Sequence, residues 1–240
     1  GMLVVNNDDL YDKLYFIHNS VGNCMSVWDS YLISRGIKKG QLEIILHNIR
    51  DYTNDKHKKV DDYPFGGGPG MIMKPEPIFN AVDAVSKKYS IPKETPKILL
   101  SPQGQQFNHE IAQNLSAHNE IIMICGRYEG LDERIRENLT TDEISIGDYI
   151  LSGGEIASMV IIDAVSRLIP GVLGSEKSPL NDSFYDGLLQ FPQYTRPASF
   201  RSMDVPDIIL SGNHAEIAKW RKRQSIIRTK KSRPDLLDKC

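Results

Sequence analysis

The sequence predicts an α/β fold with a mostly parallel β-sheet. Continuous apolar runs at residues 97–100 and 121–125 are bounded by loops, as expected for strands that are covered on both faces. A third apolar run, at residues 144–151, leads directly into a segment of helical spacing. Because strands of this kind alternate with helical segments along the chain, the pattern favours the α/β class.

Further elements precede and separate these runs. Residues 41–47 are strand-like, whereas residues 63–70 contain four glycines and two prolines and exclude a helix or a strand interior. Residues 76–89 have the spacing of a helix, because Ile78 and Val82 share a face. Two shorter segments also have helical spacing: residues 111–115 and 132–138.

The second half of the chain is more helical. Residues 155–168 are apolar nearly all round, which predicts a helix buried in a core or at a subunit interface. Pro170 ends this helix, and residues 171–182 have the composition of a flexible linker. Asn213 and Glu216 form a capping-box pattern at the start of a basic helix.

Composition excludes several classes of protein. The chain is 40% hydrophobic and 25% charged, which is ordinary for a soluble globular protein. No apolar run reaches the length of a membrane span, and the N-terminus has no signal-peptide pattern. The three cysteines are far apart and fit neither a disulfide framework nor a metal cluster. We therefore expect a cytoplasmic protein without a membrane partner and without a protein metal site.

Charge is unevenly distributed. The formal net charge is only −2, but the segment from Lys219 to the end is rich in lysine and arginine. A basic stripe on a neutral body can be the footprint of a nucleic-acid partner. A solvated face of a terminal helix would have the same composition.

Glycine-marked breaks at residues 101–104, 126–130 and 152–154 adjoin the apolar runs. Backbone groups in such loops can approach a ligand closely, because no Cβ atom intervenes. Ligands of open α/β sheets bind at the carboxyl ends of the strands, so the three breaks predict a small-molecule site built from backbone. The alternative is that the glycines only form tight turns. The common dinucleotide and P-loop fingerprints are absent.

Seven segments resemble, in order, the motifs of the bacterial TrmD-type tRNA (guanine-N1)-methyltransferases of the SPOUT superfamily. They are residues 65–71 (FGGGPGM), 100–104 (LSPQG), 125–134 (CGRYEGLDER), 145–155 (SIGDYILSGGE), 169–174 (IPGVLG), 194–197 (YTRP) and 211–217 (SGNHAEI). The resemblance runs from about Ser34 to Leu237. The family usually opens with a strand and a Leu-Phe-Pro-Glu turn, and residues 2–24 do not match that opening.

The resemblance implies a knotted fold and a specific reaction. A deep trefoil knot is expected over roughly residues 98–155, within a homodimer whose active sites lie at the subunit interface. S-adenosylmethionine is the implied cofactor, and magnesium is implied to help. The implied reaction transfers a methyl group to N1 of the guanine 3′ of the anticodon, position 37 of tRNA. The implied domains are a knotted cofactor-binding domain (1–172), a linker or lid (173–182) and a helical tRNA-binding domain (183–240).

The resemblance also assigns the cofactor pocket residue by residue. The expected members are Leu100, Ser101, Pro102, Gly126, Tyr128, Gly130, Ile146, Gly147, Asp148, Tyr149, Ile150, Leu151, Gly153 and Gly154. Adenine requires a flat apolar slot with backbone donors and acceptors, which such loops supply.

Three residues match the catalytic positions of the family. Removal of the guanine N1 proton calls for a general base, and the charge that spreads to O6 calls for a cation or donor. Asp182 matches the proposed base, Arg167 the stabilising cation, and Glu129 a contact to the target guanine. Taken alone, Asp182 reads as a linker or cap residue, Arg167 as the partner of Asp163 on one helix face, and Glu129 as a surface residue.

RNA contacts are expected on both sides of this site. The basic helix would hold phosphates through Lys219, Lys222 and Arg223. Asp61 and Asp62 match a family motif that we assign to reading the preceding guanine. Residues 171–182 carry the proposed base, and we expect them to order over the site when tRNA binds.

Two other functions remain open at this point. One is a SPOUT methyltransferase that acts on ribosomal RNA or on a ribose hydroxyl, which residues 194–197 and the C-terminal helical domain argue against. The other is a catalytically silent RNA-binding protein that keeps the knot, which Asp182, Arg167 and Glu129 argue against.

Overall fold

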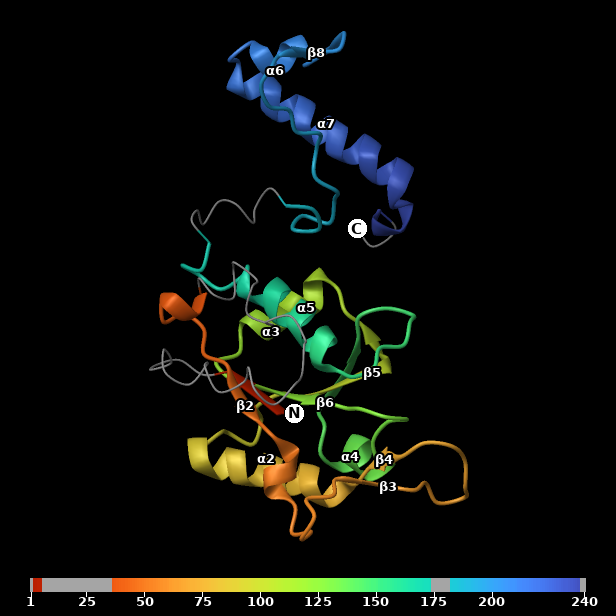
Figure 1. The fold of residues 1–240 in the computed structure, drawn as a ribbon. Helices are drawn as coiled ribbons and strands as arrows, with labels where there is room; N and C mark the ends of the chain where they lie inside the picture. Colours follow the sequence, from red (N-terminus) through yellow and green to blue (C-terminus); the bar gives the residue numbers. More distant parts are fainter. Residues whose placement is uncertain (1, 6–35, 174–181, 238–240) are drawn as a thin grey trace. The chain divides into compact units, whose positions relative to one another are not determined.

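The computed structural model describes residues 2–5, 36–173 and 182–237. It divides into two compact units, residues 1–173 and residues 174–240, each of which is described by itself (Figure 1). The segment 174–181, which holds most of the expected linker, lies outside the described residues.

A five-stranded sheet forms the centre of the first unit. Its strands, in spatial order, are β2 (Ile45–His47), β1 (Met2–Val5), β6 (Ile121–Cys125), β5 (Lys97–Gln106) and β7 (Asp142–Ser145). The pairs β5/β6 and β5/β7 are parallel, whereas β1 is antiparallel to both of its neighbours. Since β1 alone is reversed, four of the five strands run in one direction. The predicted α/β class with parallel strand pairs is confirmed.

The N-terminal strand is the main departure from the sequence-based expectation. Residues 2–24 do not match the usual opening of the family, yet Met2–Val5 forms β1 in the interior of the sheet. The expected strand at 41–47 is shorter and covers only Ile45–His47. The remainder of the divergent segment lies outside the described residues.

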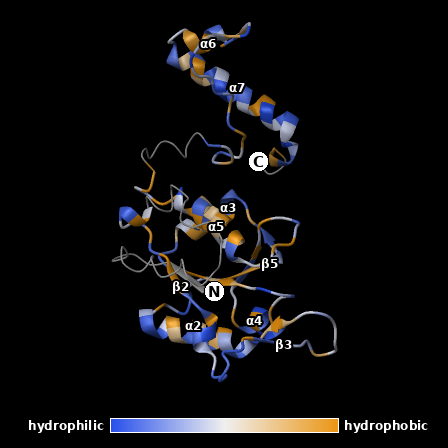
Figure 2. Ribbon diagram, in the orientation of Figure 1, coloured by the Kyte–Doolittle hydropathy of each residue, from blue (hydrophilic) through white to orange (hydrophobic). Residues whose placement is uncertain are grey.

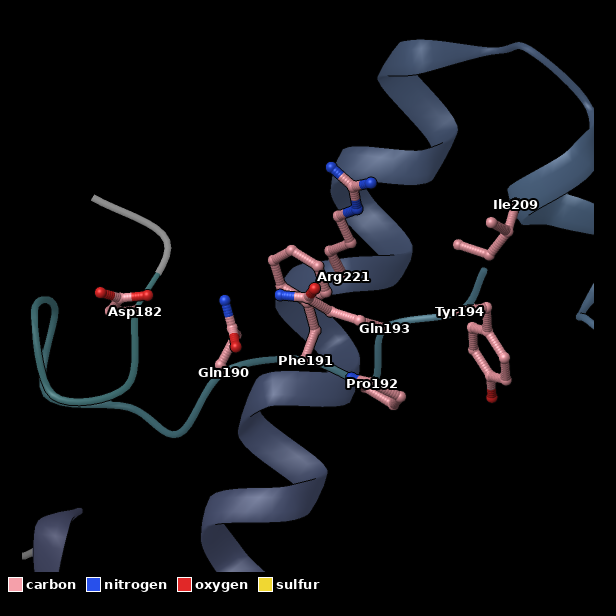
Figure 3. A pocket seen from close by; sticks show the side chains of 8 residues that line it. All are labelled: Asp182, Gln190, Phe191, Pro192, Gln193, Tyr194, Ile209 and Arg221. Atoms are coloured by element: carbon pink, nitrogen blue, oxygen red, sulfur yellow. The ribbon is translucent and has the colours of Figure 1, made fainter. Parts of the chain in front are cut away.

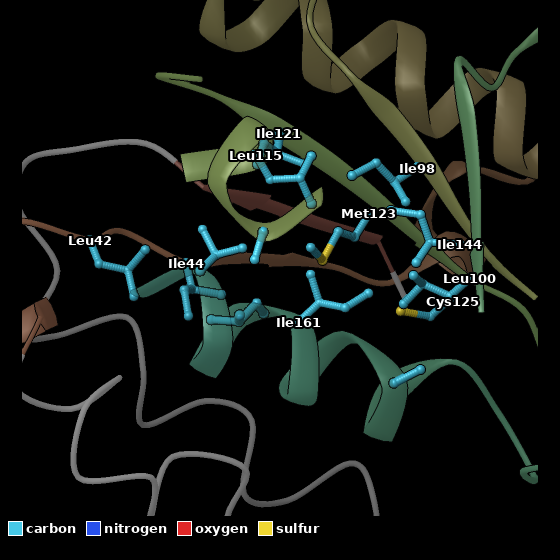
Figure 4. Packing of buried hydrophobic residues seen from close by; sticks show 14 residues of the cluster. Leu42, Ile44, Ile98, Leu100, Leu115, Ile121, Met123, Cys125, Ile144 and Ile161 are labelled. Atoms are coloured by element: carbon cyan, nitrogen blue, oxygen red, sulfur yellow. The ribbon is translucent and has the colours of Figure 1, made fainter. Parts of the chain in front are cut away.

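Helices cover both faces of the sheet (Figure 1). One face carries α2 (Pro75–Tyr89) and α4 (Glu133–Asn138), and the other carries α3 (His109–Ser116) and α5 (Glu155–Ser166). The strands alternate between the two resulting cores, as their pleat requires. In β5, Ile98 and Leu100 belong to the core beneath α3 and α5 (Figure 4), whereas Leu99 belongs to the core beneath α2.

Helix α5 confirms the prediction of a largely apolar helix, with one qualification. Ile161 and Val165 are buried in the core, but Ile156 and Val160 are 54% and 45% exposed in the single chain. The hydropathy colouring shows that α5 is rich in apolar residues (Figure 2), and Ile161 and Val165 pack in one core with residues of β5 and β6. The two exposed residues leave an apolar strip on the helix.

Smaller elements complete the first unit. A 3₁₀ turn, η3 (Ile49–Tyr52), follows β2, and a two-stranded ribbon joins β3 (Asp61–Asp62) to β4 (Ile72–Met73) in antiparallel register. The glycine-rich segment forms the connection between these two strands, as its composition predicts. Among the described residues, no helix is long and apolar enough to cross a membrane.

The second unit is organised by one long helix. Its elements are β8 (Ser199–Phe200), β9 (Met203–Asp204), α6 (Asp207–Leu210), α7 (His214–Ser232) and η5 (Pro234–Leu236). The side chain of Asn213 caps α7 by accepting a hydrogen bond from the backbone N–H of Glu216 at 3.3 Å. The Glu216 carboxylate pairs with Lys219 at 2.8 Å, so only the Asn213 half of the capping pattern is seen.

Stability is expected to fall in mild acid because of a buried histidine. His47 is buried, its Nδ1 lies 2.6 Å from the Tyr52 hydroxyl, and burial together with the Lys88 ammonium lowers the pKa of His47. As the pH falls through the ordinary histidine pKa, near 6.5, the unfolded chain takes up a proton that the folded chain resists. The free energy of unfolding should then fall by at most about 1.4 kcal/mol per pH unit.

Thermal melts of the wild type and of His47→Gln between pH 8 and pH 5 test this expectation. The wild type should lose stability faster than the variant over this range, because glutamine cannot take up a proton. Parallel pH profiles for the two proteins would assign the acid sensitivity to other groups.

Candidate active site

Two of the predicted glycine loops, 126–130 and 152–154, lie beyond the carboxyl ends of β6 and β7, and the third, 101–104, interrupts the neighbouring parallel strand β5. Leu100 and Gln105 are both registered against Ile144, so the intervening residues 101–104 leave the ladder as a bulge. The loop after β6 is joined to the segment before α5, because the Gly154 N–H donates to the Gly126 carbonyl at 2.9 Å. The sequence-predicted convergence is therefore present in the fold.

Close backbone approach explains why glycine occupies two of these positions. A Cβ atom at Gly154 would lie 2.9 Å from the Cα of Cys125. A Cβ atom at Gly104 would overlap with the backbone of Glu143 and Ile144. The packing of loop against strand thus depends on the missing side chain at each position.

The loop that follows β7 is exposed and held by local contacts. Gly147 has a φ of +152°; its N–H donates to the Ser145 hydroxyl at 3.2 Å, and that hydroxyl donates to the Gly147 carbonyl at 3.1 Å. Tyr149 and Ile150 are 53% and 81% exposed. The other expected cofactor contacts on this loop are Ile146, Asp148 and Leu151. Exposed side chains with apolar surface, such as those of Tyr149 and Ile150, suit a flat, partly apolar ligand.

Two ionic contacts that sequence reasoning missed tie the loops to the scaffold. Arg127 of the β6 loop pairs with Glu155, the first residue of α5, at 2.8 Å. Arg136 of α4 donates to the Gln103 side chain in the β5 bulge at 2.9 Å, and its Nε lies 3.3 Å from a Glu143 carboxylate oxygen. These partners are far apart in sequence, so no local pattern signals them.

Glu129 lies against the glycine-rich connection between β3 and β4. A Cβ atom on Gly70 would overlap with the Glu129 side chain, and the Glu129 N–H donates to the Met71 carbonyl at 3.2 Å. The Met73 N–H donates to the Gly130 carbonyl at 3.0 Å, which joins the ribbon that carries Asp61 and Asp62 to the same loop. Three of the predicted guanine contacts thus belong to one connected group of loops.

The two remaining catalytic candidates belong to different units. Arg167 follows the last residue of α5, and its N–H donates to the Asp163 carbonyl at 3.3 Å. Asp182 begins the described part of the second unit and lines a cavity there.

The predicted phosphate-binding residues of α7 differ in their partners. Lys219 pairs with Glu216 at 2.8 Å and Lys222 with Asp186 at 2.7 Å. The hydrogen bond from Lys222 lowers the pKa of Asp186. Arg223 is exposed and has no ion-pair or hydrogen-bond partner in the described part of the chain. The two lysine pairs are solvent-exposed, and such pairs cost little to exchange for a phosphate.

The remaining reactive groups do not form a competing site. Cys125 is buried beneath the loops, and burial raises the pKa of its thiol to about 11. The thiol therefore stays protonated near neutral pH and is a poor nucleophile. Within residues 2–5, 36–173 and 182–237, no group of three or more His, Cys, Asp or Glu side chains could hold a metal ion.

Comparison with known proteins decides the family. The model of the family described as tRNA (Guanine-1)-methyltransferase TrmD matches residues 21–239. The chain belongs to this family. The predicted family, and with it an enzyme that methylates guanine in tRNA, is confirmed.

Several bacterial relatives have the same assignment. A tRNA (guanine-N(1)-)-methyltransferase of Dehalococcoides mccartyi (strain 195) is 55% identical over 214 residues, which is 89% of this chain and 86% of the relative. The Geotalea uraniireducens protein of that name is 56% identical, over 86% of this chain and 82% of the relative. The Staphylococcus carnosus protein of that name is 57% identical, over 87% and 83%.

The family match encloses every predicted site residue. The first of these, Asp61, and the last, Arg223, both lie inside residues 21–239. Strand β1 lies outside the match, in agreement with the departure noted for the N-terminal segment. The divergence therefore affects a central strand of the scaffold and leaves the candidate site within the shared part of the chain.

Proposed function

We propose that the chain transfers the methyl group of S-adenosylmethionine to N1 of the guanine at position 37 of tRNA. The single observation that carries the proposal is the convergence of three loops, after β6, after β7 and in the bulge of β5, inside a chain of the tRNA guanine methyltransferase family. The family supplies the reaction, and the loops supply a place for the cofactor beside Glu129.

The loops fit the cofactor by their chemistry. The bulge at 101–104, the turn at 126–130 and the loop at 146–154 offer backbone donors and acceptors next to exposed apolar side chains. Gly154 keeps the segment before α5 close to the end of β6, and Gly104 keeps the β5 bulge close to β7. The bound cofactor would supply the methyl group as an electrophile.

Residues of the chain would accept the N1 proton of the guanine and stabilise the negative charge that develops on it. We assign Asp182 to accept the N1 proton, which is not lost unaided near neutral pH. Arg167 would stabilise the negative charge that moves to O6. Glu129 would hold the guanine edge, from a position fixed by Gly70 and the Met71 carbonyl.

The knot, the dimer and the lid belong to the same proposal. A trefoil knot over residues 98–155 stays a prediction from the family resemblance. A homodimer is supported by the exposed apolar strip of Ile156 and Val160 on α5. Ordering of residues 171–182 over the site stays a prediction, because residues 174–181 lie outside the described residues.

A shared active site makes a direct prediction for mixed dimers. If Asp182 of one protomer acts with Arg167 of its partner, dimers of Asp182→Ala and Arg167→Ala subunits hold one complete site. Each mixed dimer should have up to about half of the activity of a wild-type dimer, so a random equal mixture should recover up to about a quarter, whereas each variant alone stays inactive. Absence of any recovery would place both residues of each site on one protomer.

The partners and the location follow from the substrate. We propose tRNA as the nucleic-acid partner and the cytoplasm as the compartment, with phosphates bound along α7. Magnesium dependence stays a prediction from the family resemblance. The rate of methyl transfer before and after EDTA treatment, with magnesium restored in a matched sample, measures it.

Analysis of the methylated nucleoside tests the proposed chemistry. The protein is incubated with tRNA and labelled S-adenosylmethionine, and the RNA is digested to nucleosides. Label in 1-methylguanosine is the expected result. Label in a 2′-O-methyl nucleoside would instead identify a SPOUT enzyme of the ribose-methylating kind, and RNA binding without any label would identify a silent RNA-binding protein.

Loss of the contacts from Arg136 to Gln103 and Glu143 is expected to weaken cofactor binding. Arg136 holds Gln103 in the β5 bulge and faces Glu143. A hydrogen bond that involves a charged group contributes about 1.5–3 kcal/mol, so Arg136→Met should raise the Kd for S-adenosylmethionine by up to roughly 10- to 150-fold if the cofactor has to order the released bulge.

Calorimetric titration measures that change, and Arg134→Met is the matched control. Arg134 lies on the same helix but is exposed and pairs with Asp132. Its replacement should leave the Kd within about twofold. Equal losses in the two variants would show that the charge of α4, and not the hold on the bulge, is responsible.

A further inference from the structure

A cavity in the second unit has no assigned role. It has a volume of about 340 Å³ and lies between the chain at 190–194 and the helices α6 and α7 (Figure 3). Its lining residues are Asp182, Gln190, Phe191, Pro192, Gln193, Tyr194, Ile209 and Arg221. Small-molecule sites in proteins begin at about this size, and a single nucleobase is well within it.

The wall of the cavity is anchored to α7. The Leu189 N–H donates to the Thr229 hydroxyl at 2.9 Å, and Arg228 donates to the Gln190 carbonyl at 3.0 Å. Thr229 is fully buried, and its hydroxyl donates to the Ser225 carbonyl at 2.7 Å. The Gln190 N–H donates to the Ser183 hydroxyl at 2.9 Å. The cavity is therefore a built feature of this unit.

The lining combines a guanidinium group stacked on an aromatic ring with two amide side chains. The Arg221 guanidinium lies over the Phe191 ring, with 4.7 Å between the guanidinium carbon and the ring centroid. The Gln190 and Gln193 side chains have no hydrogen-bond partner among the described residues. Tyr194 is 48% exposed, and its ring is 6.5 Å from that of Trp220.

These groups match the recognition of an unpaired base. Bases that are splayed out of a single-stranded loop stack on aromatic or guanidinium planes and hydrogen-bond through their edges. Amide side chains can donate and accept at once, as a base edge requires. The carboxylate of Asp182 lines one side of the cavity and disfavours an acidic ligand. Arg223, which lies on α7 as Arg221 does, offers a cation for a neighbouring phosphate.

We propose that this cavity binds one unpaired base of the tRNA anticodon loop, other than the target guanine and the guanine before it that is assigned to Asp61 and Asp62. Phe191 and Arg221 hold the face of the base, and Gln190 and Gln193 contact its edge. This inference rests on the proposed function. Since Asp182 lines the same cavity, a base held here fixes the position of the RNA relative to the residue that accepts the N1 proton.

Two conservative variants test the cavity. Gln193→Ala removes an exposed side chain, and Arg221→Lys keeps the charge but removes the planar group. Stacking on a protein side chain contributes enough per base to change binding by roughly 5- to 150-fold. Arg221→Lys should therefore lower kcat/KM by about tenfold, mainly through KM, on a tRNA transcript with guanine at position 37. Gln193→Ala removes a neutral hydrogen bond to the base edge and should lower kcat/KM by roughly 2- to 10-fold.

The control is Lys87→Ala, which removes an exposed charge from the last turn of α2, outside the cavity lining and outside α7. It should lower kcat/KM by less than about threefold at moderate salt. Melting curves of all variants should superimpose on the wild type. A variant that melts earlier is replaced by Gln190→Ala, whose side chain lines the same cavity.

Abasic transcripts decide whether a base is the occupant. Anticodon-loop positions other than the target are made abasic one at a time. At one position, loss of the base should lower the wild-type kcat/KM by about tenfold, and Gln193→Ala or Arg221→Lys should then cause no further loss.

Two results would overturn the inference. One is that the variants lower kcat/KM, relative to the wild type, by the same factor on every abasic transcript. The other is that they do not lower kcat/KM on the complete transcript. A wild-type protein that methylates none of the transcripts would contradict the proposed function itself, so the two failures are distinguishable.

Discussion

Replacing Asp182 with asparagine is expected to lower kcat for methyl transfer by about 10²- to 10⁴-fold, the usual contribution of a general base. The amide has nearly the same size as the carboxylate but cannot accept the N1 proton. Binding of S-adenosylmethionine should be unchanged, because Asp182 lies in the second unit and the cofactor loops lie in the first. Single-turnover kinetics measure the chemical step directly.

A pH profile separates the proposed base from a structural role. In Asp182→Asn the proton must leave N1 to solvent, so the rate should rise with pH while guanine N1 remains mostly protonated. Asp186→Asn is the matched control, because Asp186 is a nearby aspartate that pairs with Lys222 at 2.7 Å. It should keep kcat within about threefold. Equal losses in both variants, without a change in pH dependence, would remove Asp182 from the proton transfer.

Replacing Gly104 with alanine is expected to damage the cofactor site and the fold together. The added methyl group would overlap with the backbone of Glu143 and Ile144 on β7, and backbone cannot move aside as a flexible side chain can. Overpacking of this kind costs about 1–3 kcal/mol or more, which corresponds to a fall in Tm of roughly 5–10 °C. Binding of S-adenosylmethionine should weaken at least tenfold.

Gly66→Ala is the control for the glycine prediction. Gly66 has a φ of +87°, but a Cβ atom there would have no neighbour within 4 Å. Its replacement should cost only the roughly 1–2 kcal/mol of an unfavourable backbone conformation. Calorimetric melts measure the loss of stability in both variants, and cofactor titrations measure their affinity for S-adenosylmethionine. Because the two stability costs overlap, the affinity for S-adenosylmethionine decides: if Gly104→Ala binds the cofactor as tightly as Gly66→Ala, the bulge is not packed against β7 as described.

Much of the fold was predictable because its signals are local. The alternation of Ile98 and Leu100 with Leu99 between two cores explains why this run is apolar throughout. Helix α3 begins where Asn108 caps it, since its side chain accepts from the Ile111 N–H at 3.0 Å. The continuation of β5 to Gln106 was not predictable, because residues 101–106 are mostly polar and pair with β7 only after a bulge.

Other features depend on contacts between distant residues. Strand β1 is held by pairing with β2 and β6, more than 40 residues and more than 110 residues away, which no local pattern in Met2–Val5 reveals. The glycines of the site were visible in the sequence, because close approach selects for glycine. The Arg136 contact to Gln103 and the cavity around Phe191 were not, because exposed arginines and glutamines occur on most surfaces.

Methyl transfer to two tRNA transcripts that differ only at position 37, guanine against adenine, tests the central claim most directly. The account predicts label from S-adenosylmethionine on the guanine transcript alone. Equal label on both transcripts would contradict it, because the methyl acceptor would then lie elsewhere in the tRNA.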